Sequence, residues 1–384
     1  MNWMQAREVV MLDRRMLTNF DWFFFSLTVI IALIGLSTVF SATWSPERGV
    51  SGIFIKQAQW MTIGMAVMAV VIFVDYRSWC RFSYPLYGIT IFLLLVVLVA
   101  GKSAMGAARW ISLGPISFQP SELAKLALIA TIAKYLSENP PVGGLTLKGL
   151  MKPAALLLVP LLLVAKQPDL GTALLLLFVV TAILFVSGIN RRTLTGIISS
   201  ALLISPLAGY LFWHGLKEYQ KNRLLVFFKP DSDPTGIGYH VIQSKIAIGS
   251  GMLTGKGYLS GTQSHLKFLP ERHTDFIFAV FAEEWGLLGS MFLLALYFLL
   301  VMRGIEIALT TKDRLGKLLA TGATSMLFFY VLINMGMTMG VMPVVGVPLP
   351  LMSYGGTAML TTFIAIGILI NVRMRRFMMV GGAR

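Results

Sequence analysis

Long apolar runs, each about the length of a membrane-spanning helix, dominate this 384-residue chain. Hydrophobic residues make up 56% of the sequence and charged residues 13%, about half the charged fraction of an ordinary soluble domain. A helix of about 20 residues crosses the ~30 Å hydrocarbon core of a bilayer, whereas the alternating polarity of barrel strands is not seen. The sequence therefore predicts an all-α integral membrane protein, with residues 1–384 forming a single polytopic domain.

The apolar runs predict about ten transmembrane helices. Their expected ranges are 20–42, 55–74, 82–101, 119–137, 153–165, 170–188, 194–213, 275–302, 318–340 and 351–372. The fifth run is short and holds Pro153 and Pro160, so we expect it to be irregular or strongly tilted. The only long polar segment, residues 214–274, separates the seventh run from the eighth and is predicted to be a loop.

Basic residues are unevenly distributed over the connections between these runs. With the N-terminus inside, the inner connections are rich in arginine and lysine, as at Arg77 and Arg314, while the short outer ones keep few, such as Lys56 and Lys166. The positive-inside rule then predicts that both termini are cytoplasmic and that the 214–274 loop is extracytoplasmic. The net charge of +15 is scattered over many loops, so we predict contacts with membrane lipids and no nucleic-acid partner.

A cluster of titratable residues directly precedes the eighth run. The segment Phe268–Phe276 reads F-L-P-E-R-H-T-D-F and contains Glu271, Arg272, His273 and Asp275. Carboxylates, a histidine and a cation gathered at a membrane surface suit chemistry on a charged substrate that is carried by a lipid. This segment is the first candidate for a functional site.

Acidic and basic residues also occur inside the apolar runs, where each is costly in lipid. Glu122 and Lys125 lie three residues apart in the fourth run, so they can pair on one helix face. Two roles stay open for them: a structural ion pair, or the lining of a polar cavity. In the eighth run, Glu283 lies ~80° around the helix from Asp275 and is expected to face the same cavity. Glu284 points elsewhere and is expected to bond a neighbouring helix.

No dedicated metal or nucleotide site is evident in the sequence. The four histidines all lie within residues 214–274 and lack the H-E-x-x-H spacing of a zinc site. Gly249–Gly257 resembles a P-loop, but its glycine spacing is wrong and no serine or threonine follows Lys256. The single Cys80 excludes an intrachain disulfide. The cofactor therefore stays unknown, with a divalent cation such as Mg²⁺ as one option.

Several ordered motifs resemble the SEDS family (shape, elongation, division and sporulation proteins) over nearly the whole chain. They are R-W-I-S-L-G at 109–114, Q-P-S-E-L-A-K at 119–125, Q-P-D-L-G-T-A at 167–173, D-P-T-G-I-G-Y-H-V-I-Q-S-K-I-A-I-G-S-G at 233–251, G-T-Q-S-H-L-K-F-L-P-E-R-H-T-D-F-I-F at 261–278 and P-V-V-G-V-P-L-P-L-M-S-Y-G-G at 343–356. P-E-R-H-T-D and V-G-V-P-L-P look like the elongation type. Met252 and Lys267 depart from the family pattern, which often has glycine and an acidic residue there.

The resemblance implies a peptidoglycan glycosyltransferase of the bacterial cytoplasmic (inner) membrane. Family members polymerise lipid II, a disaccharide-pentapeptide on undecaprenyl pyrophosphate, at the outer face of that membrane during cell elongation and shape maintenance. The implied partners are a class B penicillin-binding protein (a transpeptidase), the elongation machinery, lipid II and the lipid-linked nascent glycan. Two alternatives stay open: a lipid II flippase or transporter, and a non-catalytic membrane scaffold for the penicillin-binding protein.

Asp275 is the candidate general base for this reaction. A sugar 4-hydroxyl must lose its proton as it attacks an anomeric carbon, and the leaving pyrophosphate needs positive charge nearby. The candidate substrate-binding residues are Arg109, Trp110, Glu122, Lys125, Arg223, Gln263, Arg272, His273, Thr274 and Glu283. A transporter would need charge at mid-membrane depth and a broken-helix repeat, whereas the acids here lie mostly at the outer rim, which favours the enzyme.

Overall fold

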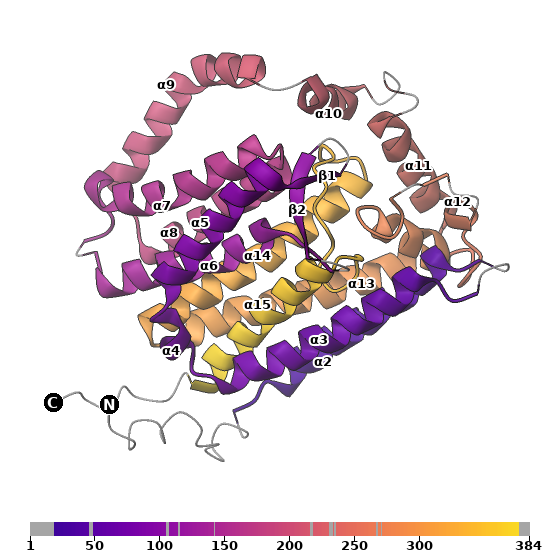
Figure 1. Ribbon diagram of the computed structural model, residues 1–384, viewed down its shortest axis with the longest axis horizontal. Coiled ribbons are helices and arrows are strands. Elements are labelled where there is room, and N and C mark those ends of the chain that lie inside the picture. The colour runs from indigo at the N-terminus through magenta and orange to yellow at the C-terminus, as the bar shows by residue number, and fades with distance from the viewer. Residues whose placement is uncertain are drawn as a thin grey trace.

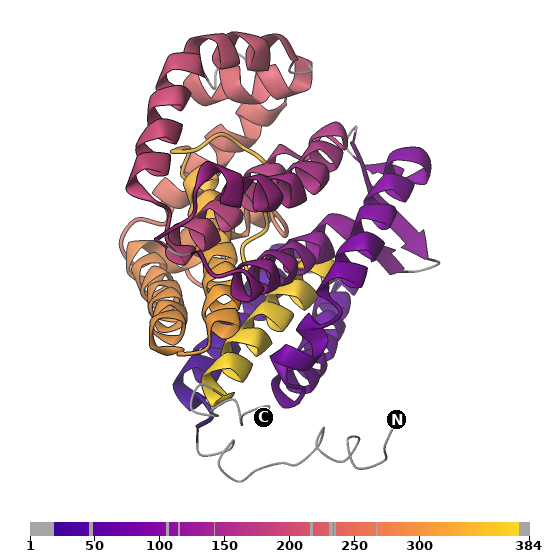
Figure 2. The same ribbon diagram turned by 90° about the vertical axis from the view of Figure 1, so that its left-hand side faces the viewer.

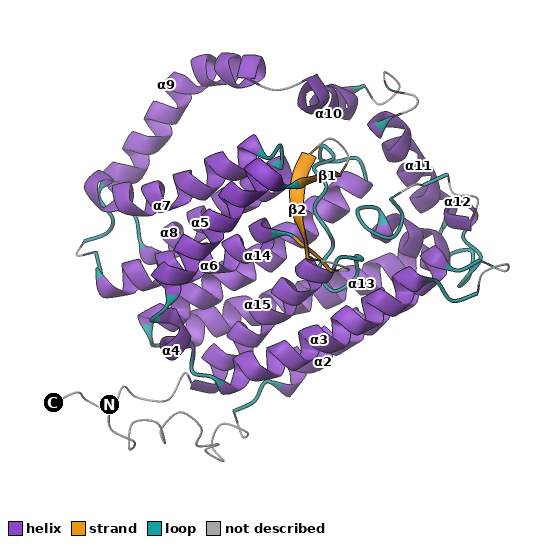
Figure 3. Cartoon of the chain, viewed as in Figure 1, coloured by secondary structure: helices purple, strands orange, loops and turns teal. Residues whose placement is uncertain are grey.

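The structure is a computed structural model, and it describes residues 19–45, 49–104, 107–113, 116–141, 143–215, 218–229, 233, 236–265, 268–269 and 271–375. Helices dominate these ranges (Figures 1 and 3). Seven helices are long and apolar enough to cross a membrane singly, and an eighth span is added when the bent pair Arg191–Leu207 and Gly209–Gly215 is joined. The expected fold class, an all-α multi-pass membrane protein, is confirmed.

Ten long helices in the described chain correspond to the ten apolar runs. They are α2 (Trp22–Thr43), α3 (Gly52–Phe73), α5 (Ser83–Ala100), α6 (Pro120–Glu138), α7 (Leu147–Lys166), α8 (Leu170–Ser187), α9 (Arg191–Gly215), α13 (Ile277–Thr310), α14 (Arg314–Thr338) and α15 (Gly356–Arg375). By length and composition alone, α5 and α6 are not counted among the helices that could cross a membrane. Helix α6 is excluded because of its charged residues, which include Glu122, Lys125 and Lys134.

The expectation that the fifth run is irregular is wrong, because α7 is a continuous helix of 20 residues. Its two internal prolines each remove one backbone donor. The carbonyl that Pro160 leaves without its helical partner belongs to Leu156, and the Tyr87 hydroxyl of α5 donates to that oxygen at 2.8 Å. A neighbouring helix thus supplies the donor that proline removes.

Short elements that the apolar pattern did not predict cover one end of the bundle. Strands β1 (Lys102–Ala104), β2 (Ala107–Leu113) and β3 (Ile116–Phe118) form an antiparallel sheet in that order. The polar segment predicted as a loop contains the helices α10 (Glu218–Phe228), α11 (Ile237–Ser250) and α12 (Thr262–His265). At the opposite end, a further short helix, α4 (Tyr76–Cys80), connects α3 to α5 and reaches Asp313 through Arg77. That the 214–274 segment is extracytoplasmic stays a prediction.

The helices differ in how much of their surface other helices cover. In the most apolar window of α14 and of α15, 78% of the residues are buried, against 22% in α3 and in α7. Helices α14 and α15 therefore form the middle of the bundle, and α3 and α7 present apolar side chains outward, where lipid would contact them. Helix α9 lies at the periphery in both views (Figures 1 and 2).

Contacts at the two ends of α2 define the two ends of the molecule. At its start, Asp21 accepts from Arg303 of α13 and Arg373 of α15, both at 2.8 Å. At its end, the Ala42 carbonyl accepts from Arg272 Nε at 2.6 Å. The start of the first described helix, α2, and the end of the last, α15, therefore lie together. They mark the end of the bundle opposite Arg272.

Helix α13 is broken within its length at Gly286, whose φ of 63° and ψ of −162° are not helical. The backbone groups freed at the break bond to the loop after α11: Lys256 N donates to Glu283 O at 3.0 Å and Leu287 N to Met252 O at 2.8 Å. The loop thus replaces helical hydrogen bonds that would otherwise be missing in the bundle.

Candidate active site

The segment Glu271–Phe276 forms a tight turn that leads into α13. The Glu271 carbonyl accepts from the backbone N–H groups of Thr274 and Phe276, both at 3.2 Å. The Thr274 hydroxyl donates to the Glu271 carboxylate at 2.8 Å. Two backbone bonds and two bonds from the Thr274 hydroxyl, to the carbonyl and the carboxylate of Glu271, therefore close the turn.

Arg272 and His273 face structural partners. Arg272 donates to the end of α2, as described above, and the His273 carbonyl accepts from Tyr354 N at 2.8 Å. The His273 ring lies beside the Tyr354 ring, with 5.8 Å between centroids. Burial lowers the pKa of His273, so its ring is uncharged at neutral pH. These contacts hold the turn in place but do not bring either side chain onto Asp275.

Asp275 is held from two sides. The amide of Asn334, a buried residue of α14, donates to the Asp275 carbonyl at 2.9 Å and to the Val347 carbonyl at 2.7 Å. Next to Val347, Gly346 faces the carboxylate so closely that a Cβ there would lie 3.3 Å from Asp275 Oδ2. Asp275 as a whole residue is partly exposed, in contrast to the buried residues that follow it in α13.

The electrostatic surroundings suit Asp275 to proton transfer. Burial raises its pKa to about 6, and the Glu271 carboxylate acts in the same direction. Arg223 of α10 and Arg109 of β2 act in the opposite direction, and Asp169 raises the pKa further. Two of the predicted cations therefore act electrostatically on the candidate base. A pKa near the operating pH is what a general base requires.

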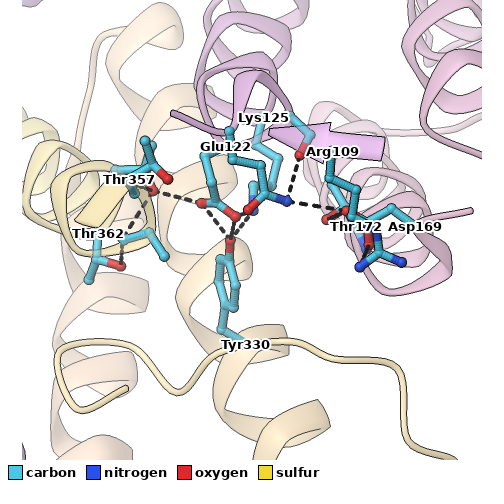
Figure 4. A network of polar contacts seen from close by, with 12 residues as sticks. Arg109, Glu122, Lys125, Asp169, Thr172, Tyr330, Thr357 and Thr362 are labelled. Atoms are coloured by element: carbon cyan, nitrogen blue, oxygen red, sulfur yellow. Dashed lines mark hydrogen bonds and ion pairs between the residues drawn. The ribbon is translucent and has the colours of Figure 1, made fainter. Parts of the chain in front are cut away.

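Arg109 is fixed by the start of α8. Its guanidinium lies 3.6 Å from the Asp169 carboxylate and donates to the Pro168 carbonyl. Asp169 in turn caps α8, because it accepts from the backbone N–H and the hydroxyl of Thr172 at 3.2 and 2.9 Å. Figure 4 shows Asp169 between Arg109 and Thr172. Asp169 was not among the predicted site residues, although an acid just before an apolar run is a recognisable N-cap signal.

Glu122 and Lys125 form the ion pair that their spacing predicts, with 2.6 Å between Oε1 and Nζ and both side chains almost fully buried. The Tyr330 hydroxyl of α14 contacts both residues, and it lies 3.0 Å from Glu122 Oε2. Thr361 of α15 donates to the same carboxylate at 2.8 Å. The pair therefore joins three helices (Figure 4). A small cavity lined by Tyr330, Ser353 and other residues reaches this network, so the structural and the cavity-lining roles both stay open.

Glu283 contacts the loop before the turn. Its fully buried carboxylate accepts from Lys256 Nζ at 2.7 Å, the Thr262 hydroxyl at 3.0 Å and Gln263 N at 3.1 Å. The structure thus brings Glu283 and Gln263 together, but no contact between Glu283 and Asp275 is described. A shared cavity for the two carboxylates stays a prediction.

The remaining predictions concern Glu284 and Trp110. Glu284 accepts from the Ser41 hydroxyl of α2, which confirms the expected bond to a neighbouring helix. Trp110 is partly exposed on β2 and, as the next residue after Arg109, points to the opposite face of the sheet. Lys267, which departs from the family pattern, lies outside the described residues. No cluster of three or more metal-ligating side chains occurs in the part of the chain that the structure describes.

A family described as cell cycle protein, which takes in FtsW, RodA and SpoVE, matches residues 20–377 of this chain. The chain belongs to the SEDS family. The match covers all ten long helices, so the family membership predicted from the sequence motifs is confirmed.

Curated relatives of this SEDS protein carry enzyme names. The peptidoglycan glycosyltransferase MrdB of Escherichia coli (strain K12) is 43% identical over 356 residues, which cover 92% of this chain and 94% of MrdB. The peptidoglycan glycosyltransferase RodA of Treponema pallidum (strain Nichols) is 32% identical over 433 residues, which cover 94% of this chain and 99% of that relative.

Two solved structures share the fold of this SEDS protein. One is a chain of a peptidoglycan synthase complex, described for its structural coordination of polymerization and crosslinking. It is 34% identical, with a TM-score of 0.79. The other, the rod shape-determining protein RodA of Thermus thermophilus, is 32% identical with a TM-score of 0.68. Each match covers 93% of this chain and 98% of the other chain.

Proposed function

We propose that this chain is a peptidoglycan glycosyltransferase that polymerises lipid II in cell elongation, with Asp275 as its general base. The observation that carries the proposal is Asp275: the residue is partly exposed, the pKa of its carboxyl group is raised to about 6, and Arg109 and Arg223 act on it electrostatically. The names of the relatives, peptidoglycan glycosyltransferase in each case, support the reaction class.

The proposed reaction joins two lipid-linked sugars. The 4-hydroxyl oxygen of one attacks the anomeric carbon of the other, and its proton passes to the Asp275 carboxylate. A new carbon–oxygen bond forms while the bond from the anomeric carbon to the pyrophosphate breaks. The pyrophosphate leaves with the bonding electrons, and the guanidinium groups of Arg109 and Arg223 stabilise its charge. Asp275 then releases the proton to water before the next cycle.

The proposal includes a location and partners. We place the Asp275 end of the bundle at the outer face of the bacterial cytoplasmic membrane, and both termini in the cytoplasm, although the terminal residues lie outside the described ranges. Support comes from the opposite end, where basic residues such as Arg77, Arg314 and Arg373 gather. A class B penicillin-binding protein and the elongation machinery are the proposed partners, and the peptidoglycan synthase complex among the structural relatives supports this.

A lipid II flippase is the second candidate, because the structure adds one observation in its favour. Helix α13 is broken at Gly286, next to the two buried acids Glu283 and Glu284, and broken helices with polar groups are typical of transporters. The described residues contain one further broken span, the bent pair in α9, but α9 holds no acidic residue. The inverted pair of broken helices that transporters use is therefore not evident here.

Polymer formation in detergent separates the two functions. Purified protein is mixed with lipid II and a cognate class B penicillin-binding protein whose transpeptidase serine is blocked, and glycan strands are measured. An enzyme makes strands without a two-sided membrane, and Asp275→Asn should reduce their rate at least ~10²-fold, the scale of a positioned base. A flippase makes no bond and gives no strands. Strand formation at a normal rate by Asp275→Asn would remove Asp275 from the mechanism. If wild type also makes no strands, the proposal that this chain is a glycosyltransferase is overturned.

A further inference from the structure

The connection between α14 and α15 binds the backbone that directly precedes the candidate base. Its Tyr354 N–H donates to the His273 carbonyl at 2.8 Å, and its Ser353 hydroxyl donates to the Thr274 carbonyl at 2.7 Å. The two donors are neighbours in the connection, and the two carbonyls are the last ones before Asp275. One short segment therefore holds the turn by two successive peptide groups.

Ser353 is bonded through its hydroxyl and through its carbonyl. The hydroxyl oxygen accepts from Leu349 N at 2.8 Å, so its one proton is free to bond the Thr274 carbonyl. The Ser353 carbonyl accepts from the side-chain amide of Gln57, in α3, at 3.1 Å. Gln57 is 1% exposed and Ser353 is 4% exposed, so neither bond is shared with bulk water.

Two further helices pack on the same connection. Gly35 of α2 approaches so closely that a Cβ there would lie 2.4 Å from the Leu351 carbonyl oxygen. The φ of Leu351 is +64°, a value that residues with a Cβ rarely adopt. Tyr297 of α13 donates to the Pro350 carbonyl at 2.5 Å. A strained residue persists only where its surroundings hold it, so the connection is fixed in one arrangement by α2, α3 and α13.

We infer that Gln57 is a positioning residue for the candidate base, acting through Ser353 on the turn before Asp275. Gln57 is two hydrogen bonds away from the turn, by way of the Ser353 carbonyl and the Ser353 hydroxyl. A catalytic group must be held within about 0.5 Å of its productive position, and bonds at such a distance can control that position. The inference rests on the proposed function to the extent that Asp275 is the base.

Gln57→Met is the variant that separates positioning from stability. Methionine is about as large as glutamine and has no amide, so the bond to the Ser353 carbonyl is lost. The Gln57 Oε1 atom, which is buried and has no hydrogen-bond partner among the described residues, is removed as well. The carbonyl that loses its donor and the unpaired oxygen that disappears have opposite effects on stability. The variant should therefore fold.

Hydrogen–deuterium exchange of the full-length protein in detergent measures the turn directly. Two amides of the turn, Thr274 N and Phe276 N, are bonded to the Glu271 carbonyl, so their exchange reports how often the turn opens. In Gln57→Met the exchange rate of a peptide covering these amides should rise about fivefold, the effect of one lost hydrogen bond. An unchanged exchange rate in this variant overturns the inference.

Ser353 and Thr131 provide the comparison variants. Ser353→Ala loses the bond to the turn itself and should speed its exchange at least as much as Gln57→Met does, whereas Ser353→Thr keeps the hydroxyl and should restore the slow exchange. Thr131 of α6 is the matched control, because its fully buried hydroxyl donates to the Ser83 carbonyl at 3.1 Å, at the start of α5. Thr131→Val should leave the exchange of the turn unchanged. If Gln57→Met does not fold, the two Ser353 variants decide the inference: equal exchange rates in both overturn it.

Polymerisation shows whether the position of the turn affects the reaction. Gln57→Met should lower the maximal rate about tenfold or more with little change in the lipid II concentration at half-maximal rate, because the base moves while the substrate-binding cations stay. Thr131→Val should change neither quantity. Faster exchange of the turn with a normal maximal rate would make Gln57 a structural residue and overturn the inference. If wild type makes no polymer, the proposed function fails, while the exchange rates still decide whether Gln57 holds the turn.

Discussion

At the scale of single residues, the pKa of Asp275 makes the proposed mechanism testable by pH. The base must be deprotonated to accept a proton, and burial raises its pKa to about 6. The polymerisation rate should therefore be constant above about pH 7 and fall about tenfold per pH unit below about pH 6. Initial rates between pH 4.5 and 8, at saturating lipid II, would show this limb.

His273 provides the control for that profile. Burial lowers its pKa from the ordinary histidine range, so its imidazole also gains a proton only on the acidic side of neutrality. The variant His273→Gln removes the imidazole and keeps a side chain of similar size. The acidic limb should persist in this variant, and its loss would transfer the titration from Asp275 to His273.

Asn334 is predicted to position the base. Its amide bonds the Asp275 and Val347 carbonyls, so Asn334→Ala frees both segments around the carboxylate and should lower the maximal rate about tenfold or more. The pH midpoint of the rate should also move, because the surroundings of the carboxylate change. Asn334→Asp, which loses the donor but keeps the shape, should behave like the alanine variant.

The chain offers a matched control for Asn334. Asn371 of α15 is equally buried, and its amide donates to the Val71, Ile72 and Val74 carbonyls at the other end of the bundle. Asn371→Ala should lower the melting temperature about as much as Asn334→Ala does. It should leave the pH midpoint of the polymerisation rate unchanged in the folded protein. If both variants had the same kinetics, Asn334 would be only a structural residue.

Which site residues the sequence predicts depends on how local their contacts are. Glu122 and Lys125 are neighbours on one helix turn, so their spacing alone predicts the pair. Asn334 bonds a carbonyl 59 residues away in the chain, and no local pattern marks an asparagine in an apolar helix for that role. Arg223 acts electrostatically on Asp275, although it lies in another element far away in the sequence.

At the scale of elements, Gly286 determines the break in α13. Its φ of 63° and ψ of −162° lie in a region that is essentially restricted to glycine. A Cβ there would lie 2.7 Å from the Leu253 carbonyl oxygen and 2.8 Å from that of Gly251. Gly286→Ala should therefore lower the melting temperature by about 5 °C or more, as measured by thermal unfolding in detergent.

Gly88 is the matched glycine for this experiment. It lies in helix α5, and a Cβ there would meet nothing within 4 Å. Gly88→Ala should leave the melting temperature unchanged or raise it slightly, since alanine is favoured by about 0.5–1 kcal/mol inside a helix. Equal melting temperatures of the two variants would show that the break does not depend on the glycine.

For helices and strands too, the sequence predicts best what local sequence determines. Hydrophobicity over about 20 residues is a strong signal, and all ten apolar runs are helices. Strands of three residues, such as β1 and β3, are too short to show a period, so the sheet was not predicted. The continuity of α7 could not be predicted either, because it depends on the Tyr87 hydroxyl from another helix.

At the scale of the whole molecule, the proposed function requires that the Asp275 end face outward. The ion pairs at Asp21 bring the first and last described helices to the other end. Lys312 lies in the turn between α13 and α14, at this same end. Glu218 lies in α10, on the Asp275 side, with 85% of its side chain exposed. These two positions report the orientation of the whole bundle.

Cysteine labelling in intact cells tests that orientation, because Cys80 is buried and buried thiols react slowly. Glu218→Cys should react with a membrane-impermeant maleimide in intact cells whose outer layers have been made permeable. Lys312→Cys should react only after the cytoplasmic membrane is opened, since its connection is predicted to be cytoplasmic by its neighbouring basic residues. The reverse result would place Asp275, Arg109 and Arg223 in the cytoplasm. Polymerisation at the outer face would then be impossible for this site, whatever its chemistry in detergent.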